Sequence, residues 1–122
     1  MLFSPCNDMP PEYFFREGCH ISEWANSELD PECSIARARV EPGQTTRWHF
    51  LRGTTERYVV LSGEGLVELE STGPQKVGPG DVVLIPPLVA QRITNTGLQD
   101  LVFLAICTPR FVSGCYEEMK ES

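Results

Sequence analysis

Two stretches of the sequence decide the fold: GQTTRWHFLRGTTERYVVLSGEG at residues 43–65 and GDVVLIPPLVAQRITN at residues 80–95. Both consist of short runs of β-branched, aromatic and other apolar residues, which glycine and proline separate. Such runs are typical of β-strands, and the glycines and prolines between them are typical of turns. The two stretches therefore predict short strands joined by tight turns.

The same pattern continues on both sides of these stretches. Turn residues recur at short intervals, and no helical periodicity precedes the last dozen residues, where a short helical turn is expected around Tyr116 to Met119. Short strands at regular spacing predict an all-β sandwich or barrel. The expected strands lie at residues 19–25, 34–40, 46–51, 57–61, 66–70, 81–85, 91–95 and 101–107.

The spacing of residues in the two stretches resembles the two motifs of the cupin family. The first motif is matched by Gly43, His49, Glu56 and Gly63, and the second by Gly80, Pro86 and Asn95. This resemblance implies an antiparallel cupin-type β-barrel, a double-stranded β-helix of jelly-roll-like form. We expect the barrel at residues 19–110, with a loose N-terminal segment at 1–18 and a C-terminal tail at 111–122.

The chain departs from the cupin motifs at Leu51 and Gln91, where the family has histidines, and at Leu88, where it has glycine. Metal-binding cupins typically hold their ion with three histidines and one glutamate. The resemblance therefore implies His49, Glu56 and Gln91 as candidate ligands of Fe, Mn, Ni or Zn, bound weakly because an amide oxygen is a poor donor. A pocket with no metal stays equally open, because ligand number largely decides metal retention.

Strand geometry predicts which side chains share a face, since alternate residues of a strand point the same way. The candidate residues fall into three groups that each share a face: Arg47, His49 and Leu51; Glu56, Tyr58 and Val60; and Gln91 with Ile93. If the cupin register holds, all three groups face one cavity lined by polar and apolar side chains. We expect a small-molecule site with Arg47, Leu51, Gln91, Val60 and Ile93 in contact with the ligand, and with His49, Glu56 and Tyr58 as catalytic residues. Arg47 in this role would clamp a substrate carboxylate or phosphate.

Three functions fit such a pocket. The first is an enzyme that acts on a small organic metabolite with a weakly held divalent metal, as an oxygenase, isomerase or lyase. The second is a metal-free isomerase, epimerase or lyase in which Glu56 orients His49 as a general base and Tyr58 donates a proton. The third is a non-catalytic ligand-binding module. We interpret Cys107 and His20 as a small buried residue and a surface or interface residue, with no catalytic role.

Composition narrows the class of partner. The 122 residues include 17 acidic and 10 basic side chains, a net charge of −7, which disfavours nucleic acid because phosphate binding needs a basic surface. The chain shows neither a signal peptide nor a long apolar segment, so we expect no membrane partner and a cytoplasmic location with the 5 cysteines reduced. A homodimer is expected through an exposed edge strand such as residues 19–25.

Overall fold

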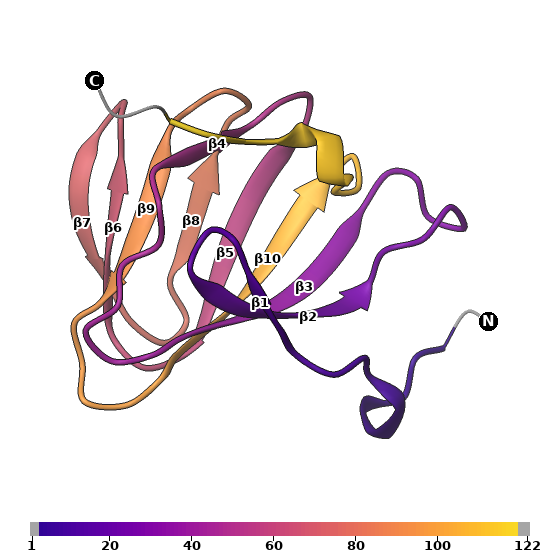
Figure 1. Ribbon diagram of the computed structural model, residues 1–122, viewed down its shortest axis with the longest axis horizontal. Helices are drawn as coiled ribbons and strands as arrows, with labels where there is room; N and C mark the ends of the chain where they lie inside the picture. Colours follow the sequence, from indigo (N-terminus) through magenta and orange to yellow (C-terminus); the bar gives the residue numbers. More distant parts are fainter. Residues whose placement is uncertain (1–2, 120–122) are drawn as a thin grey trace.

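The structure, a computed structural model, describes residues 3–119, and it consists of two antiparallel sheets that face each other (Figure 1). The larger sheet has the strand order β1 (Tyr13–Phe15), β2 (Cys19–Ala25), β3 (Ser34–Val40), β10 (Leu101–Thr108), β5 (Thr55–Ser62) and β8 (Val82–Ile85). The smaller sheet has the order β11 (Tyr116–Glu118), β4 (His49–Leu51), β9 (Gln91–Asn95), β6 (Gly65–Leu69) and β7 (Gly73–Val77). The remaining elements are the 3-10 turns η1 (Cys6–Asp8) and η2 (Ser113–Cys115).

The expected all-β architecture is confirmed, and each expected strand is present with bounds shifted by a few residues at most. The sheets extend beyond residues 19–110 at both ends, because β1 pairs with β2 and β11 pairs with β4. The helical turn expected around Tyr116 to Met119 is wrong, since residues 116–118 form β11. Pairing with β4 and packing of the Tyr116 ring override the weak local signal. Within residues 3–119 no helix has the length and apolar character needed to cross a membrane.

The core lies between the sheets and follows the alternation of the strands. In β5 every second residue from Glu56 to Val60 is buried, and in β9 Gln91, Ile93 and Asn95 are buried. Apolar positions of the two sheets meet along most of the interface and form one cluster with Val40, Leu101 and Phe103. The polar positions Glu56 and Gln91 lie together at one end of the core, whereas the buried Asn95 lies at the opposite end of β9.

Two turns explain motif positions. Gly63 has a φ of +87°, and a Cβ there would lie 2.6 Å from the carbonyl oxygen of Asp100, so the β5–β6 turn requires glycine. Leu88, which replaces the glycine of the second cupin motif, has a φ of 69°. This left-handed conformation is unfavourable for leucine but is readily adopted by glycine. The backbone at this position therefore keeps the conformation that favours the glycine of the motif.

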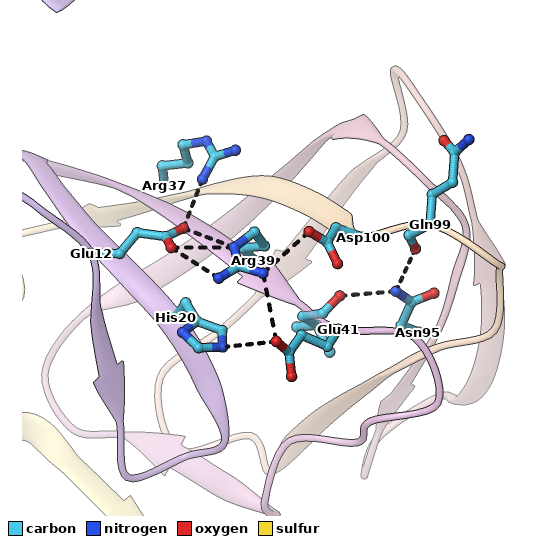
Figure 2. Close-up of polar contacts among 9 residues, drawn as sticks. Glu12, His20, Arg37, Arg39, Glu41, Asn95, Gln99 and Asp100 are labelled. Atoms are coloured by element: carbon cyan, nitrogen blue, oxygen red, sulfur yellow. Dashed lines mark hydrogen bonds and ion pairs between the residues drawn. The ribbon is translucent and has the colours of Figure 1, made fainter. Parts of the chain in front are cut away.

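A network of ion pairs ties the N-terminal segment to the outer surface of the larger sheet (Figure 2). Glu12 accepts hydrogen bonds from Arg37 and Arg39 at 3.0 Å, and Arg39 also contacts Asp100 at 3.2 Å. These side chains are partly exposed, so each pair contributes little stability alone. Together they hold residue 12 against β3, which positions the following strand β1 over the end of the core.

Candidate active site

A cavity opens between the two sheets at the end of the core where the polar residues gather. The empty space of the cavity, together with the open solvent at its mouth, amounts to about 470 Å³. The walls come from β1, β2, β3, β5 and β10 of the larger sheet, from β4 and β11 of the smaller sheet and from adjoining loops. They comprise Tyr13, Phe15, Glu17, Ile21, Glu23, Ser34, Ala36, His49, Leu51, Glu56, Ala105, Cys107, Phe111 and Tyr116.

His49 is held in one orientation at the start of β4. Its Nδ1 lies 2.7 Å from the carbonyl oxygen of Arg47. A carbonyl oxygen only accepts hydrogen bonds, so Nδ1 carries a proton and donates it. The ring also stacks on Tyr116, with the ring centres 5.1 Å apart. The second nitrogen, Nε2, is therefore the one available for chemistry in the cavity.

Glu17, in the turn between β1 and β2, faces this nitrogen. One carboxylate oxygen, Oε2, lies 3.0 Å from Nε2 of His49, and the other accepts a hydrogen bond from the thiol of Cys19 at 3.1 Å. The side chains of His49 and Glu17 are only 3% and 15% exposed, so the pair is shielded from solvent. A single proton between Nε2 of His49 and Oε2 of Glu17 would form a hydrogen bond that joins the two groups. The pair can therefore hold a proton in the cavity.

Glu56 enters the cavity from β5 at the end of a buried hydrogen-bonded chain. The hydroxyl of Tyr58 donates to Oε1 of Gln91, and Nε2 of Gln91 donates to Oε1 of Glu56 at 2.7 Å. Burial raises the pKa of Glu56 to about 7, and the negative charge of Glu17 adds to the effect, while His49, Gln91 and Cys107 oppose it. Both protonation states of Glu56 are therefore populated near neutral pH.

The structure brings some of the expected site residues to the cavity and leaves others outside it. His49, Glu56 and Leu51 line the walls. Tyr58 and Gln91 lie behind Glu56, where Tyr58 positions the amide, and burial keeps the Tyr58 pKa well above its ordinary value, so it remains protonated. The expectation that Tyr58 donates a proton to the ligand is therefore corrected to a positioning role.

Besides Gln91, three more residues expected to contact the ligand lie elsewhere. Val60 and Ile93 are 1% exposed and belong to the packed core rather than to the cavity walls. Arg47 is exposed and does not line the cavity, because β4 begins only at His49 and the preceding residues do not follow strand alternation. The shared face assumed for Arg47 and His49 is therefore wrong.

The donor set argues against the expected metal site. The carbonyl oxygen of Gln91 accepts the Tyr58 hydroxyl, so it is engaged away from the cavity, and Leu51 has no donor atom. Among residues 3–119, no group of three or more His, Cys, Asp or Glu side chains has an arrangement that could hold a metal ion. His49 and Glu56 thus remain without the further ligands that a stably held divalent ion needs, and Gln91 does not serve as a ligand in this arrangement.

Sequence reasoning missed Glu17, Glu23 and Tyr116, which line the cavity. Glu17 lies in a turn of a segment expected to be loose, and Tyr116 lies near the C-terminus. The sequence around Glu17 and Tyr116 carries no motif that indicates a site, because these residues reach the cavity only through the pairing of β1 with β2 and of β11 with β4. Cys107 also lines the cavity, with its thiol 3.9 Å from Oε2 of Glu56, and burial raises its pKa, so it is a poor nucleophile.

Comparison with known proteins accounts for this geometry. Residues 36–107, more than half of the chain, match the sequence profile of the cupin domain. The chain belongs to the cupin family. His49, Glu56 and Gln91 therefore occupy motif positions of a cupin, and the cavity lies where those motif positions converge. His20, the other histidine, lies on β2 beside Glu41, 3.6 Å away, and does not line the cupin cavity.

The curated relatives of this cupin include a glucose-6-phosphate isomerase from Pyrococcus horikoshii. The two are 32% identical over 91 residues, which cover 65% of this chain and 48% of the relative. A second glucose-6-phosphate isomerase, from Pyrococcus abyssi, is 30% identical over the same length. The chain thus spans about half the length of the curated relatives that it matches.

Among solved structures, the cupin resembles a nucleoside dehydratase from Streptomyces, of which a variant was solved with uridine. The structure with uridine has a TM-score of 0.80 and 18% identity, and the match covers 98% of this chain and 92% of the other. A Bacillus subtilis oxalate decarboxylase with Mn(II) centres has a TM-score of 0.77 and 22% identity, with 89% of this chain and 30% of the other covered. These similarities establish the double-stranded β-helix fold.

Proposed function

We propose that this cupin is an enzyme that moves protons on a small organic metabolite, with His49 and Glu56 as its acid and base. One observation carries the proposal: an imidazole with a defined tautomer and a carboxyl group with a pKa of about 7 line the same shielded cavity. Groups that titrate near the working pH are the most effective general acids and bases. This is the second of the three functions expected from the sequence, with two roles changed. Glu56, expected to orient His49, supplies the proton, and Tyr58, expected to donate it, takes a positioning role.

The two groups suit removal of a proton from carbon and its delivery to oxygen. In a dehydration, Nε2 of His49 takes a proton from the carbon beside a carbonyl, and the carbon–hydrogen electron pair becomes a carbon–carbon double bond. The hydroxyl on the next carbon then leaves with the proton of Glu56 as water. In an isomerisation, His49 takes the proton from the carbon beside the carbonyl while Glu56 protonates the carbonyl oxygen, which gives an enediol. Glu56 then takes the proton of the other enediol hydroxyl, which becomes the new carbonyl, and His49 returns its proton to the former carbonyl carbon, so both groups regain their starting states.

Relatives of the chain support this reaction class. Two of them are named for a dehydration and an isomerisation, and both reactions need proton removal at carbon together with proton transfer at oxygen. Glu17 assists in either reaction, because its carboxylate beside Nε2 stabilises the imidazolium that forms when His49 takes a proton. No step of this scheme requires the Gln91 carbonyl or Leu51 as a metal ligand.

Hydrogen exchange in heavy water tests the proposal directly. A panel of hydroxy-aldehydes, hydroxy-ketones and nucleoside aldehydes is incubated with the protein, and deuterium incorporation beside the carbonyl is followed by NMR. We expect catalysed exchange that His49→Gln and Glu56→Gln each reduce by a factor on the order of 10² or more. His20→Gln is the matched control, because it alters the other histidine outside the cavity and leaves exchange unchanged. Equal exchange in the wild type and His49→Gln would refute the acid–base roles.

A further inference from the structure

We infer that the cavity accepts uncharged or cationic substrates and rejects phosphorylated and carboxylated ones. This inference rests on the proposed function, since it names the substrate class of the same site. The inferred substrates also differ from the substrate that the name of the curated relatives suggests, because a glucose phosphate carries a phosphate dianion that the cavity would have to accommodate.

The charges that line the cavity carry the inference. Glu17, Glu23 and Glu56 contribute three carboxyl groups, and among the described residues of the lining His49 is the sole group that can become a cation. Glu17 lies 3.0 Å from Nε2 of His49, with which it can share a proton. Glu23 contacts only the Tyr13 hydroxyl at 3.4 Å and the Asn26 amide at 3.3 Å in the described part of the chain, so its negative charge is uncompensated. Bound phosphate or carboxylate would instead need guanidinium, ammonium or aligned backbone N–H groups.

Most arginines that could supply such groups are committed to other contacts, and none of those described lines the cavity. In the lining drawn from residues 3–119 there is no arginine or lysine. On the outer surface, Arg37 and Arg39 bind Glu12, as Figure 2 shows. Four more make contacts away from the cavity: Arg52 with Glu117, Arg57 with Thr108, Arg92 with Glu68 and Arg110 with Asn26. Arg47 is exposed and does not line the cavity.

One guanidinium touches residues of the cavity without lining it. Arg16 is exposed, and its guanidinium carbon lies 4.5 Å from the ring centre of Tyr116 and 5.7 Å from that of Phe15. These cation–π contacts hold Arg16 on two of the aromatic walls. The interior keeps its uncompensated carboxylate, so Arg16 does not reverse the preference of the cavity.

The remaining walls favour an uncharged ring or carbon skeleton. Phe15, Phe111 and Tyr116 present aromatic surfaces, and Ile21 adds an aliphatic one. Removal of a phosphate or carboxylate from water into such surroundings, beside an uncompensated negative charge, is costly. One unit charge about 8 Å from Glu23, in a partly buried setting, changes affinity by roughly tenfold.

Matched ligands that differ only in charge test the inference by NMR. The protein is labelled with carbon-13 at alanine methyl groups, because Ala36 and Ala105 line the cavity whereas Ala38 and Ala90 are buried elsewhere. One set of probes is uridine and uridine 5′-monophosphate, and the other is benzylamine, benzyl alcohol and benzoate. We expect the uncharged and cationic members to shift Ala36 and Ala105 with at least tenfold higher affinity than their anionic counterparts.

Each other outcome counts against the inference. Anionic probes that bind the cavity as tightly as their uncharged partners would overturn it. A failure of every probe to shift Ala36 and Ala105 at millimolar concentration would show that the cavity is not a ligand site and would overturn it as well. Failure of the proposed function looks different: uncharged probes would bind, yet no compound of the exchange panel would incorporate deuterium.

Two variants identify the charge responsible. Glu23→Gln keeps the shape and the hydrogen-bonding capacity of the side chain, and we expect it to reduce the discrimination against anions severalfold. Arg16→Gln is the matched control, and it leaves the discrimination in place. Unchanged discrimination in Glu23→Gln would refute the electrostatic cause. Salt provides a second measurement, because screening improves binding of the anionic probes while that of the uncharged probes stays constant.

Discussion

The raised pKa of Glu56 makes the stability of the protein depend on pH in a direction opposite to that of most carboxylates. Burial first, and Glu17 second, raise this pKa from 4.5 to about 7. The folded state therefore binds the Glu56 proton more tightly than the unfolded state, so the contribution to stability is complete below about pH 4.5 and is lost as the pH rises to 7. A shift of this size corresponds to a total of about 3 kcal/mol, most of which is lost between pH 5 and pH 8.

The variant Glu56→Gln isolates this effect, because it keeps an oxygen for Gln91 but cannot ionise. Urea unfolding is followed by tryptophan fluorescence at several pH values from 5 to 8. We expect the free energy of unfolding of the variant to rise relative to that of the wild type by roughly 2 to 3 kcal/mol across this range. Glu70→Gln, at an exposed position, is the control, and its difference from the wild type stays constant. A constant difference for Glu56→Gln as well would refute the assigned burial and protonation of Glu56.

Three other predictions concern the backbone, the missing ligands and the thiols. Leu88→Gly should lower the free energy of unfolding in urea by no more than about 0.5 kcal/mol, because Leu88 has a φ of 69°. Leu84→Gly, in β8 and similarly exposed, should lower it by about 1 kcal/mol, and equal losses would contradict the backbone argument. The double variant Leu51→His and Gln91→His should copurify with a stoichiometric transition metal, measured by elemental analysis, and should melt at a lower temperature after chelation. A double variant that is folded but metal-free in micromolar nickel or zinc would show that the positions do not converge. Thermal melts with and without dithiothreitol should coincide because the 5 cysteines are free, and a lower melting temperature on reduction would reveal a disulfide.

The fold was predictable because its signals are local. Strand alternation depends on neighbouring residues, and turns depend on glycine and proline, so residues 34–40 and 91–95 could be recognised as strands from the chain alone. The motif spacing also indicated that His49 and Glu56 would converge. Where alternation holds, as in β5, the inward faces were predicted correctly, and where it fails before β4, Arg47 was misplaced.

The sequence by itself determined the all-β class, the cupin motifs and two of the polar groups of the site, because spacing along a strand fixes which side chains face inward. Only the tertiary structure decided that Glu17 and Tyr116 complete the cavity, since the β1–β2 hairpin folds over it and β11 reaches it by pairing with β4, which is distant in the chain. It also decided that Gln91 serves Glu56 rather than a metal, because the direction of an amide depends on its hydrogen-bond partners. Desolvation is likewise a property of the packed molecule, so the pKa of Glu56 follows from burial that no single stretch of sequence encodes.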